Sequence, residues 1–282
     1  MRIRTWVLLL TLTGLIKLAL LGWLGLRWTP KPYPPFAPRP TEPPSPAPWP
    51  ESLPATVRRA FGAVLPDGPR SVSTAVISGR ASLNVNGMPF KARFRFIHEA
   101  GQNYRHAFEV TWFNLPIIRA SESFVDGYCK LNLGPIGKAE GTPALFQAAT
   151  LALWSESIWL PSILVTDPRL RWEAIDDAHA RVFVPLGERE DTLLVTFDSV
   201  TGRIAAIDGL RYRDSGPTAQ KLGWHCVIRE YGTVGGAIVP TVSSIQWSDM
   251  DAPWAVWTVE DIVYNADVSA AMREPTANGK QA

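Results

Sequence analysis

The sequence is poor in cysteine, with only Cys129 and Cys226 among its 282 residues. Two cysteines in a chain of this size cannot form the disulfide framework of a small secreted domain. Neither belongs to a C-x-x-C pair, which excludes a redox or zinc motif of that kind. We predict two buried free thiols that act as small apolar residues. A single disulfide bond is the alternative if the domain lies in an oxidising compartment.

Charged residues are also few, at 19% of the chain. Residues 1–54 carry six basic and two acidic residues, which leaves 22 basic and 24 acidic residues for the remainder. A nucleic-acid-binding domain would show a basic surplus. The nearly neutral main part of the chain therefore argues against a nucleic-acid partner.

Signatures of catalysis and metal binding are missing. The chain contains no H-E-x-x-H, no G-x-S-x-G and no G-x-G-x-x-G after a strand. None of its four histidines pairs with another at a helical ligand spacing, although His98 and His106 could face each other across a hairpin. We therefore predict no metal, no cofactor and no enzymatic activity. An enzyme would have to rely on Glu156, Asp126 and arginine side chains within hydrogen-bond reach of one another.

One long apolar run is present at the N-terminus, from Trp6 to Leu26, interrupted only by Lys17. About 20 apolar residues suffice for a helix to span a bilayer. A cleaved signal peptide is the rival, but the run is long for one and no A-x-A site follows it. We predict a membrane anchor over residues 1–28 of a single-pass cell-membrane protein. Basic residues flank both ends almost equally, and we favour a cytoplasmic N-terminus with the domain outside the cytoplasm.

A proline-rich segment follows the anchor, with twelve prolines in residues 29–54. Proline fixes φ and removes a hydrogen-bond donor, so neither a helix nor a central strand can form here. We predict an extended polyproline II stalk over residues 29–53. It acts as a spacer or, alternatively, as a docking site for a proline-recognising partner.

Residues 54–268 have the pattern of an antiparallel β domain. A short helix is predicted over residues 53–65, and residues 269–282 are expected to be a disordered tail. Turn pairs stand at Asn86-Gly87, Asp126-Gly127 and Thr201-Gly202. Short alternating runs between such turns indicate a meander of strands, which we expect to curve into a sheet or half-barrel. The expected strands cover residues 72–85, 91–96, 104–113, 117–125, 128–133, 169–175, 180–185, 192–198, 203–213, 222–231, 237–248 and 254–264.

One apolar helix interrupts this pattern at about residues 143–157. Thr142 can cap it, Pro143 suits its first turn, and Pro161 stops the helical pattern. Because the segment is apolar nearly all round, we expect it to be buried on several sides, across the concave face of the sheet. A second membrane span is the rival interpretation.

Glu156 lies within this apolar helix, between two tryptophans. A buried carboxylate needs a partner, so we expect an ion pair between Glu156 and an arginine of the following strands, namely Arg169, Arg171, Arg211 or Arg213. The alternative is a polar anchor in an apolar ligand pocket. The arginine alternation itself is typical of a solvated sheet face. The candidate pocket residues are Glu156, Trp154, Trp159, Phe146, Arg171, Arg211 and Trp224.

Several segments resemble an uncharacterised bacterial family of domains of unknown function. The most specific is the Glu-x-x-Trp-x-Pro segment within residues 154–161. The others are residues 53–59, Asp126-Gly127, Arg171-Trp172-Glu173, Gly202-Arg203-Ile204, Arg211-Tyr212-Arg213, Trp224, and residues 236–247. The resemblance covers about residues 53–265 and implies a mainly antiparallel β domain without implying a reaction. In architecture alone, the layout is similar to lipoprotein-carrier folds, in which a curved sheet and a helix enclose an apolar cavity.

Two functions follow as hypotheses. The first is a membrane-tethered binding module that holds a lipid or other apolar molecule between sheet and helix, in a cavity of several hundred Å³. The second is a structural or interaction protein of the cell envelope with no small-molecule ligand, which would expose an apolar patch to a protein partner.

Overall fold

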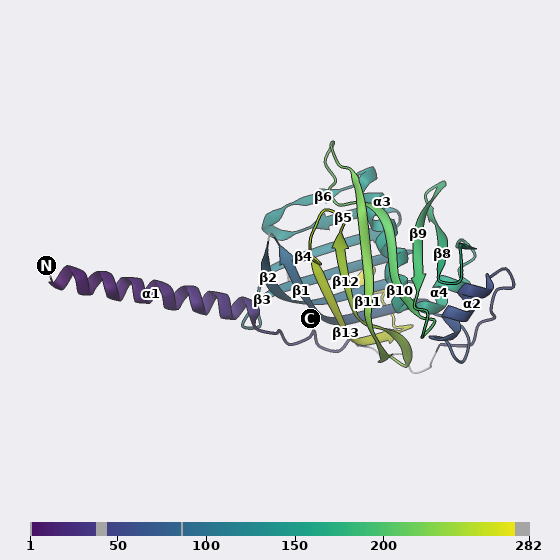
Figure 1. Ribbon diagram of the computed structural model, residues 1–282, viewed down its shortest axis with the longest axis horizontal. Helices are drawn as coiled ribbons and strands as arrows, with labels where there is room; N and C mark the ends of the chain where they lie inside the picture. The colour runs from purple at the N-terminus through teal and green to yellow at the C-terminus, as the bar shows by residue number, and fades with distance from the viewer. Residues whose placement is uncertain (1, 38–43, 86, 274–282) are drawn as a thin grey trace.

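The computed structural model describes residues 2–37, 44–85 and 87–273. Within these residues, thirteen strands form one continuous antiparallel sheet, which curves around the helix α3 (Figure 1). The order across the sheet is β6-β5-β4-β3-β2-β1-β13-β12-β11-β10-β9-β8-β7. The predicted fold, a curved antiparallel sheet with one inserted apolar helix, is confirmed.

The strands are β1 (Thr74–Val85), β2 (Met88–Glu99), β3 (Asn103–Trp112), β4 (Leu115–Val125), β5 (Tyr128–Asn132), β6 (Lys138–Glu140), β7 (Arg171–Ala174), β8 (His179–Leu186), β9 (Arg189–Phe197), β10 (Ile204–Tyr212), β11 (Lys221–Val234), β12 (Ala237–Trp247) and β13 (Ala255–Tyr264). The helices are α1 (Arg2–Arg27), α2 (Ala55–Gly62), η1 (Gly134–Ile136), α3 (Pro143–Glu156), η2 (Ser157–Trp159), α4 (Pro161–Thr166) and α5 (Ser269–Arg273).

The alternation of apolar and polar residues along each strand determines which face of the sheet is buried. On β2, Phe94 and Phe96 point into the core, while Arg93 and Arg95 lie on the outer face. Side chains of a strand alternate between the two faces, so this pattern fixes the register wherever one face is buried. Phe96 pairs with His106 of β3, which places that histidine on the concave face as well.

At several turns between strands, the residue types match the backbone conformation. Asp126 and Gly127 both have positive φ, 51° and 74°, as the two central residues of the predicted hairpin turn require. Gly202, with φ 72°, lies in the predicted turn between β9 and β10. At Asn86-Gly87, Asn86 lies outside the described residues, and Gly87 with φ 79° precedes β2. Phe113 and Asn114 form a further positive-φ turn, in which Asn readily adopts this conformation but Phe rarely does.

Helix α3 forms where the sequence predicts it. The Thr142 Oγ1 accepts a hydrogen bond from the Leu145 amide at 3.1 Å, and Pro143 occupies the first turn. Ten of its fourteen residues are buried. The helix packs on the concave side of the sheet, so the segment is a core helix and not a second membrane span.

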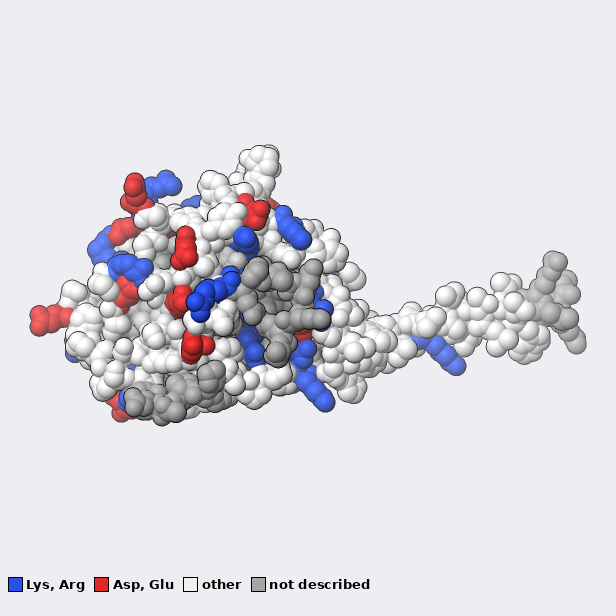
Figure 2. Space-filling model, turned by 180° about the vertical axis from the view of Figure 1, so that it is seen from behind, with Lys and Arg blue, Asp and Glu red and all other residues white. Residues whose placement is uncertain are grey.

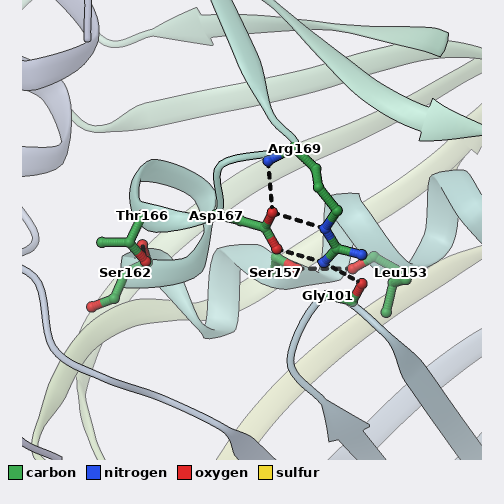
Figure 3. Close-up of polar contacts among 7 residues, drawn as sticks. All are labelled: Gly101, Leu153, Ser157, Ser162, Thr166, Asp167 and Arg169. Carbon is green, nitrogen blue, oxygen red and sulfur yellow. Dashed lines mark hydrogen bonds and ion pairs between the residues drawn. The ribbon is translucent and has the colours of Figure 1, made fainter. Parts of the chain in front are cut away.

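The segment α3–η2–α4 is fastened to the turn between β2 and β3 (Figure 3). The Arg169 guanidinium donates to the Gly101 carbonyl at 2.8 Å and to both carboxylate oxygens of Asp167, at 2.9 Å and 2.5 Å. The same guanidinium lies over the Trp154 ring, 5.3 Å from its centroid. One side chain thus ties the end of the helical segment to the sheet.

We expect Arg169→Gln to lower the free energy of unfolding by about 1–2 kcal/mol, because it removes charge-assisted hydrogen bonds to Gly101 and Asp167. Urea unfolding of the detergent-solubilised chain, followed by circular dichroism, measures the change. The matched control is Arg171→Gln, since Arg171 is exposed, pairs with the half-exposed Glu190 at 3.0 Å and lies over the Phe183 ring. That variant should stay within about 0.5 kcal/mol of the wild type. Equal losses in the two variants would contradict the anchoring role.

The N-terminal helix α1 projects from the domain (Figure 1). Residues Thr5–Arg27 form a helix long and apolar enough to cross a membrane, and none of its most apolar stretch is buried in the structure. Its last turn contacts the hairpin between β3 and β4, where the Phe113 amide donates to the Gly25 carbonyl at 3.2 Å. The end of α1 therefore lies against the β domain.

The first part of the proline-rich segment lies on the outer face of the sheet. The Lys31 amide donates to Asn114 Oδ1 at 2.7 Å, and Arg95 donates to the Pro34 carbonyl. The Tyr33 ring lies beneath the guanidinium groups of Arg93 and Arg95, 4.8 Å and 5.0 Å from its centroid. The start of the predicted spacer therefore runs along the domain, because the Tyr33 ring between the prolines contacts two cations on β2.

The face of the domain that Figure 2 shows carries interspersed acidic and basic side chains, whereas the visible side of α1 is almost without them. This distribution agrees with the nearly neutral composition of residues 55–282. At the C-terminus, residues 269–273 form α5 instead of the expected disordered tail, because Met272 packs into a small cluster with Val76 and Ile97. The rest of the predicted tail lies outside the described residues.

Candidate functional site

A cavity of about 70 Å³ lies between the concave face of the sheet and the end of α3. Strands from both halves of the sheet contribute to it, because the curvature brings β2–β4 and β10–β13 to the same helix. Its wall is mainly aromatic and aliphatic, with a few polar groups. The lining residues are Phe96, His106, Phe108, Glu122, Ala152, Ser155, Glu156, Ile158, Trp159, Arg211, Trp224, Cys226, Ser243, Ile245, Trp254 and Trp257.

The cavity is smaller than the several hundred Å³ expected from the sequence. At 70 Å³ it has space for only a few water molecules. The reason is the number of large rings packed into it: the Phe96 ring lies 5.4 Å from that of Trp257 and 6.0 Å from that of Trp159. The tryptophans that suggest a ligand pocket therefore also fill most of the available space.

Glu156 is held by two histidines at one end of this cavity. Its Oε2 lies 3.2 Å from His98 Nε2 and 2.8 Å from His106 Nε2. His98 comes from β2 and His106 from β3, and both rings are buried. The prediction of an arginine partner for Glu156 is wrong: among the described residues, the close polar contacts of this carboxylate are with the two histidines. Arginine was expected because it recurs on the following strands, but histidines on earlier strands are closer in space.

The surroundings shift the pKa values of these groups. Burial lowers the pKa of His98 below its ordinary value, and the nearby Glu156 opposes the shift only in part. Burial alone would raise the pKa of Glu156, but its close contacts with His106 and His98 outweigh burial and lower the pKa to about 2. Glu156 is therefore a carboxylate at neutral pH, and burial favours a neutral His98.

The His106 ring is fixed between two aromatic rings. The Tyr104 ring stacks on it with centroids 4.1 Å apart, and the Phe96 ring lies 4.1 Å away on a tilted plane. The Tyr104 hydroxyl donates to Glu122 Oε1 at 2.5 Å, and burial together with the Glu122 charge raises the pKa of this tyrosine well above its ordinary value. The arrangement leaves the imidazole little freedom to rotate.

Two indole groups on the cavity wall are without hydrogen-bond partners in the described structure. The Nε1 atoms of Trp224 and Trp254 are buried and unpartnered. Arg211 lies beside Trp224, with its guanidinium 5.4 Å from that ring, while its Nε donates to the Ala148 carbonyl of α3 at 2.8 Å. A buried donor without a partner costs about 1–3 kcal/mol, so these N–H groups favour an acceptor from a bound molecule.

Of the predicted pocket residues, Glu156, Trp159, Arg211 and Trp224 line the cavity. The remaining three lie elsewhere. Trp154 is beneath Arg169, Phe146 packs against Phe124 with centroids 5.7 Å apart, and Arg171 is exposed on β7 beside Phe183.

The predicted pocket residues include none of those that β2, β3 and β13 bring to the cavity, although the sequence indicates that His98 and His106 could face each other across a hairpin. His98, His106 and Phe96 share one face of a hairpin by alternation, which was the available signal. That Glu156 would meet this face could not be read from the chain, since about fifty residues separate them.

Both cysteines are buried and free, as predicted. Cys226 lines the cavity, and burial raises the pKa of its thiol to about 12. A thiol in this state is a poor nucleophile, because the thiolate is the reactive form. The alternative of a Cys129–Cys226 disulfide bond is not found.

Two solved structures share parts of this layout. A DUF1329 family protein from Desulfovibrio piger is 11% identical, with a TM-score of 0.44, over 78% of this chain and 96% of that one. A LolA superfamily protein from Nitrosomonas europaea is 9% identical, with a TM-score of 0.46, over 78% and 96% of the two chains. Because both scores lie under 0.5, what these proteins bind does not transfer to this chain.

The sequence comparisons place the chain in a family. No curated protein matches it significantly. A family model does match, over residues 45–259, which includes every residue of the cavity wall. The chain therefore belongs to DUF6544, a family of unknown function.

Proposed function

We propose that this chain is a membrane-tethered binding module whose ligand occupies the cavity between the sheet and α3. The ligand combines apolar surface with a hydrogen-bond acceptor. The observation that carries the proposal is the pair of unpartnered indole N–H groups of Trp224 and Trp254 in a mainly apolar wall that also contains a few polar side chains. Ligand pockets typically have this composition, with mostly apolar walls and a few converging polar groups.

The size of the cavity limits what fits in this conformation. Its 70 Å³ accommodates a group of only a few atoms. A lipid or another long apolar molecule therefore requires the segment α3–η2–α4 to move away from the concave face. Such a movement would break the Arg169 link to Gly101 and the hydrogen bond from Trp159 to the Pro240 carbonyl. It would also separate Glu156 from His98 and His106.

The tether places the domain at the bilayer surface. The end of α1 contacts the β3–β4 hairpin, and the antiparallel order puts the β1–β2 turn and η1 at the same end of the sheet. Apolar side chains are exposed at this end, on Val85, Met88, Leu115, Ile117, Leu133 and Ile136. We assign this surface to contact with lipid headgroups and acyl chains. The envelope-interaction alternative assigns the same side chains to a protein partner.

We expect the full chain, purified in mild detergent, to show an added organic mass in native mass spectrometry. Trp224→Phe should reduce the bound fraction about tenfold, because it removes one indole donor worth about 1–1.5 kcal/mol while keeping an aromatic ring. Solvent extraction and mass spectrometry then identify the released molecule.

The matched control is Trp172→Phe, since Trp172 donates to the Leu164 carbonyl at 2.8 Å and lies off the cavity. It should bind as the wild type does. Lipid bound around α1 would be present equally in the wild type, in Trp224→Phe and in Trp172→Phe. If wild-type protein carries no added mass and takes up none from a total membrane-lipid extract, the binding proposal is wrong.

A further inference from the structure

Three potential metal ligands converge at the inner end of the cavity. The ligand atoms of His98, His106 and Glu156 all lie within 4.8 Å of one another. Each of the three atoms, two Nε2 and one Oε2, is buried and lacks a partner with hydrogen-bond geometry. Three buried polar atoms that lie this close together without forming hydrogen bonds are unusual, because buried polar groups in proteins nearly always have hydrogen-bond partners.

The separations fit a shared cation. Zn²⁺ binds imidazole nitrogen and carboxylate oxygen at about 2.0–2.2 Å in tetrahedral geometry, which sets ligand atoms roughly 3.3 Å apart. The two measured separations from Glu156 Oε2 are 3.2 Å and 2.8 Å. All three ligand atoms lie within 4.8 Å of one another, so the two imidazole rings must adjust until each Nε2 is about 2.0–2.1 Å from a shared ion.

We propose that His98, His106 and Glu156 form a three-ligand site for a divalent transition-metal ion, with Zn²⁺ as the expected occupant. Two histidines and one glutamate are a known ligand set for zinc with an open fourth position. Imidazole ligands suit transition metals, whereas sites for Mg²⁺ or Ca²⁺ consist of oxygen ligands.

The scaffold holds the ligands in place without the metal. His98 and His106 lie on paired strands, and the His106 ring is enclosed by Tyr104 and Phe96. Glu156 ends α3, whose position is fixed by burial of most of its length. Such preorganisation is what a binding site on rigid elements requires.

The fourth position of the ion faces the cavity. His106 and Glu156 both line the 70 Å³ space, which accommodates a water molecule or one ligand atom next to the metal. Metal binding does not depend on the apolar ligand proposed above, since all three ligand atoms belong to the chain. The two proposals can therefore fail separately.

The experiment measures metal content of the full chain, purified in detergent with a histidine-free tag and without chelators. We expect inductively coupled plasma mass spectrometry to find about one ion per chain, in line with a three-ligand site. After removal with a chelator, Co²⁺ should restore binding and show the visible absorption bands of a tetrahedral site. Competition with a chromophoric chelator gives the Zn²⁺ affinity.

His98→Ala and Glu156→Gln should each lower the Zn²⁺ affinity by at least about 100-fold, because loss of a direct ligand costs more than loss of a group that only orients one. The matched control is His179→Ala, an exposed histidine paired with Asp176 at 2.9 Å, which should bind as the wild type does. Glu156→Gln keeps the shape of the side chain, and circular dichroism checks that it folds.

A purely structural His–Glu contact gives a different outcome. Wild-type protein would then carry no stoichiometric metal, show no tetrahedral Co²⁺ spectrum, and melt at the same temperature with and without Zn²⁺. Any one of these results, obtained with folded wild-type protein, overturns the proposal. This test needs no variant. An organic mass in native spectra of metal-free wild type would still support the binding proposal.

Discussion

Gly79→Val is expected to lower the free energy of unfolding by about 3 kcal/mol or more, enough to prevent accumulation of folded protein. A Cβ at this position would lie 2.0 Å from the Thr258 carbonyl oxygen and 3.1 Å from the Phe94 ring. The first of these is backbone, which cannot rotate away. Gly79 stands at a register shift where β1 meets β13, the contact that joins the first and last strands of the domain.

Intrinsic strand propensity alone predicts the opposite result, because valine is favoured over glycine in strands. The measurement is the urea midpoint of the detergent-solubilised chain, together with the yield of folded protein. Gly62→Ala is the control, because a Cβ at this helical position meets nothing within 4 Å. It should be neutral or stabilising by up to about 1 kcal/mol. Near-wild-type stability of the valine variant would mean that β1 and β13 are less closely packed than described.

Trp159→Ala is expected to destabilise the domain by about 3–5 kcal/mol, the usual range for a buried tryptophan. The Trp159 side chain is 3% exposed, and its Nε1 donates to the Pro240 carbonyl of β12 at 3.0 Å. Its own carbonyl accepts from the Tyr264 hydroxyl at 2.6 Å. Removing the indole leaves a void beside the cavity and the Pro240 carbonyl without its donor.

Trp159→Phe separates the two causes. It keeps one six-membered aromatic ring but loses the hydrogen bond to the Pro240 carbonyl and part of the indole volume, so we expect an intermediate destabilisation of about 2 kcal/mol. Trp23→Ala, in the exposed part of α1, should leave the unfolding transition of the domain unchanged. Thermal and urea unfolding followed by far-ultraviolet circular dichroism compare the three. Equal stability of Trp159→Ala and wild type would show that η2 is not held to β12 through this side chain.

Local patterns account for most of the fold. Alternation in β2 and β3, the Asp126-Gly127 turn and the Thr142-Pro143 start of α3 act over a few residues each, so the sequence predicts them directly. The length and apolarity of residues 5–27 are likewise enough to indicate a helix that could cross a membrane. Each of these depends on dihedral preference or burial of one face, which neighbouring residues determine.

The site depended on contacts between distant segments. From the sequence, Glu156 is a buried carboxylate in need of a partner, and the nearest arginines were the natural candidates. The curvature of the sheet instead brings His98 and His106 of β2 and β3 to the end of α3. Arg171 lies on β7 at the exposed edge of the sheet, whereas Arg211 lines the cavity. Alternation along the chain tells which side chains share a face, but only the tertiary structure decides which faces meet, because that depends on the summed twist and register of many strands.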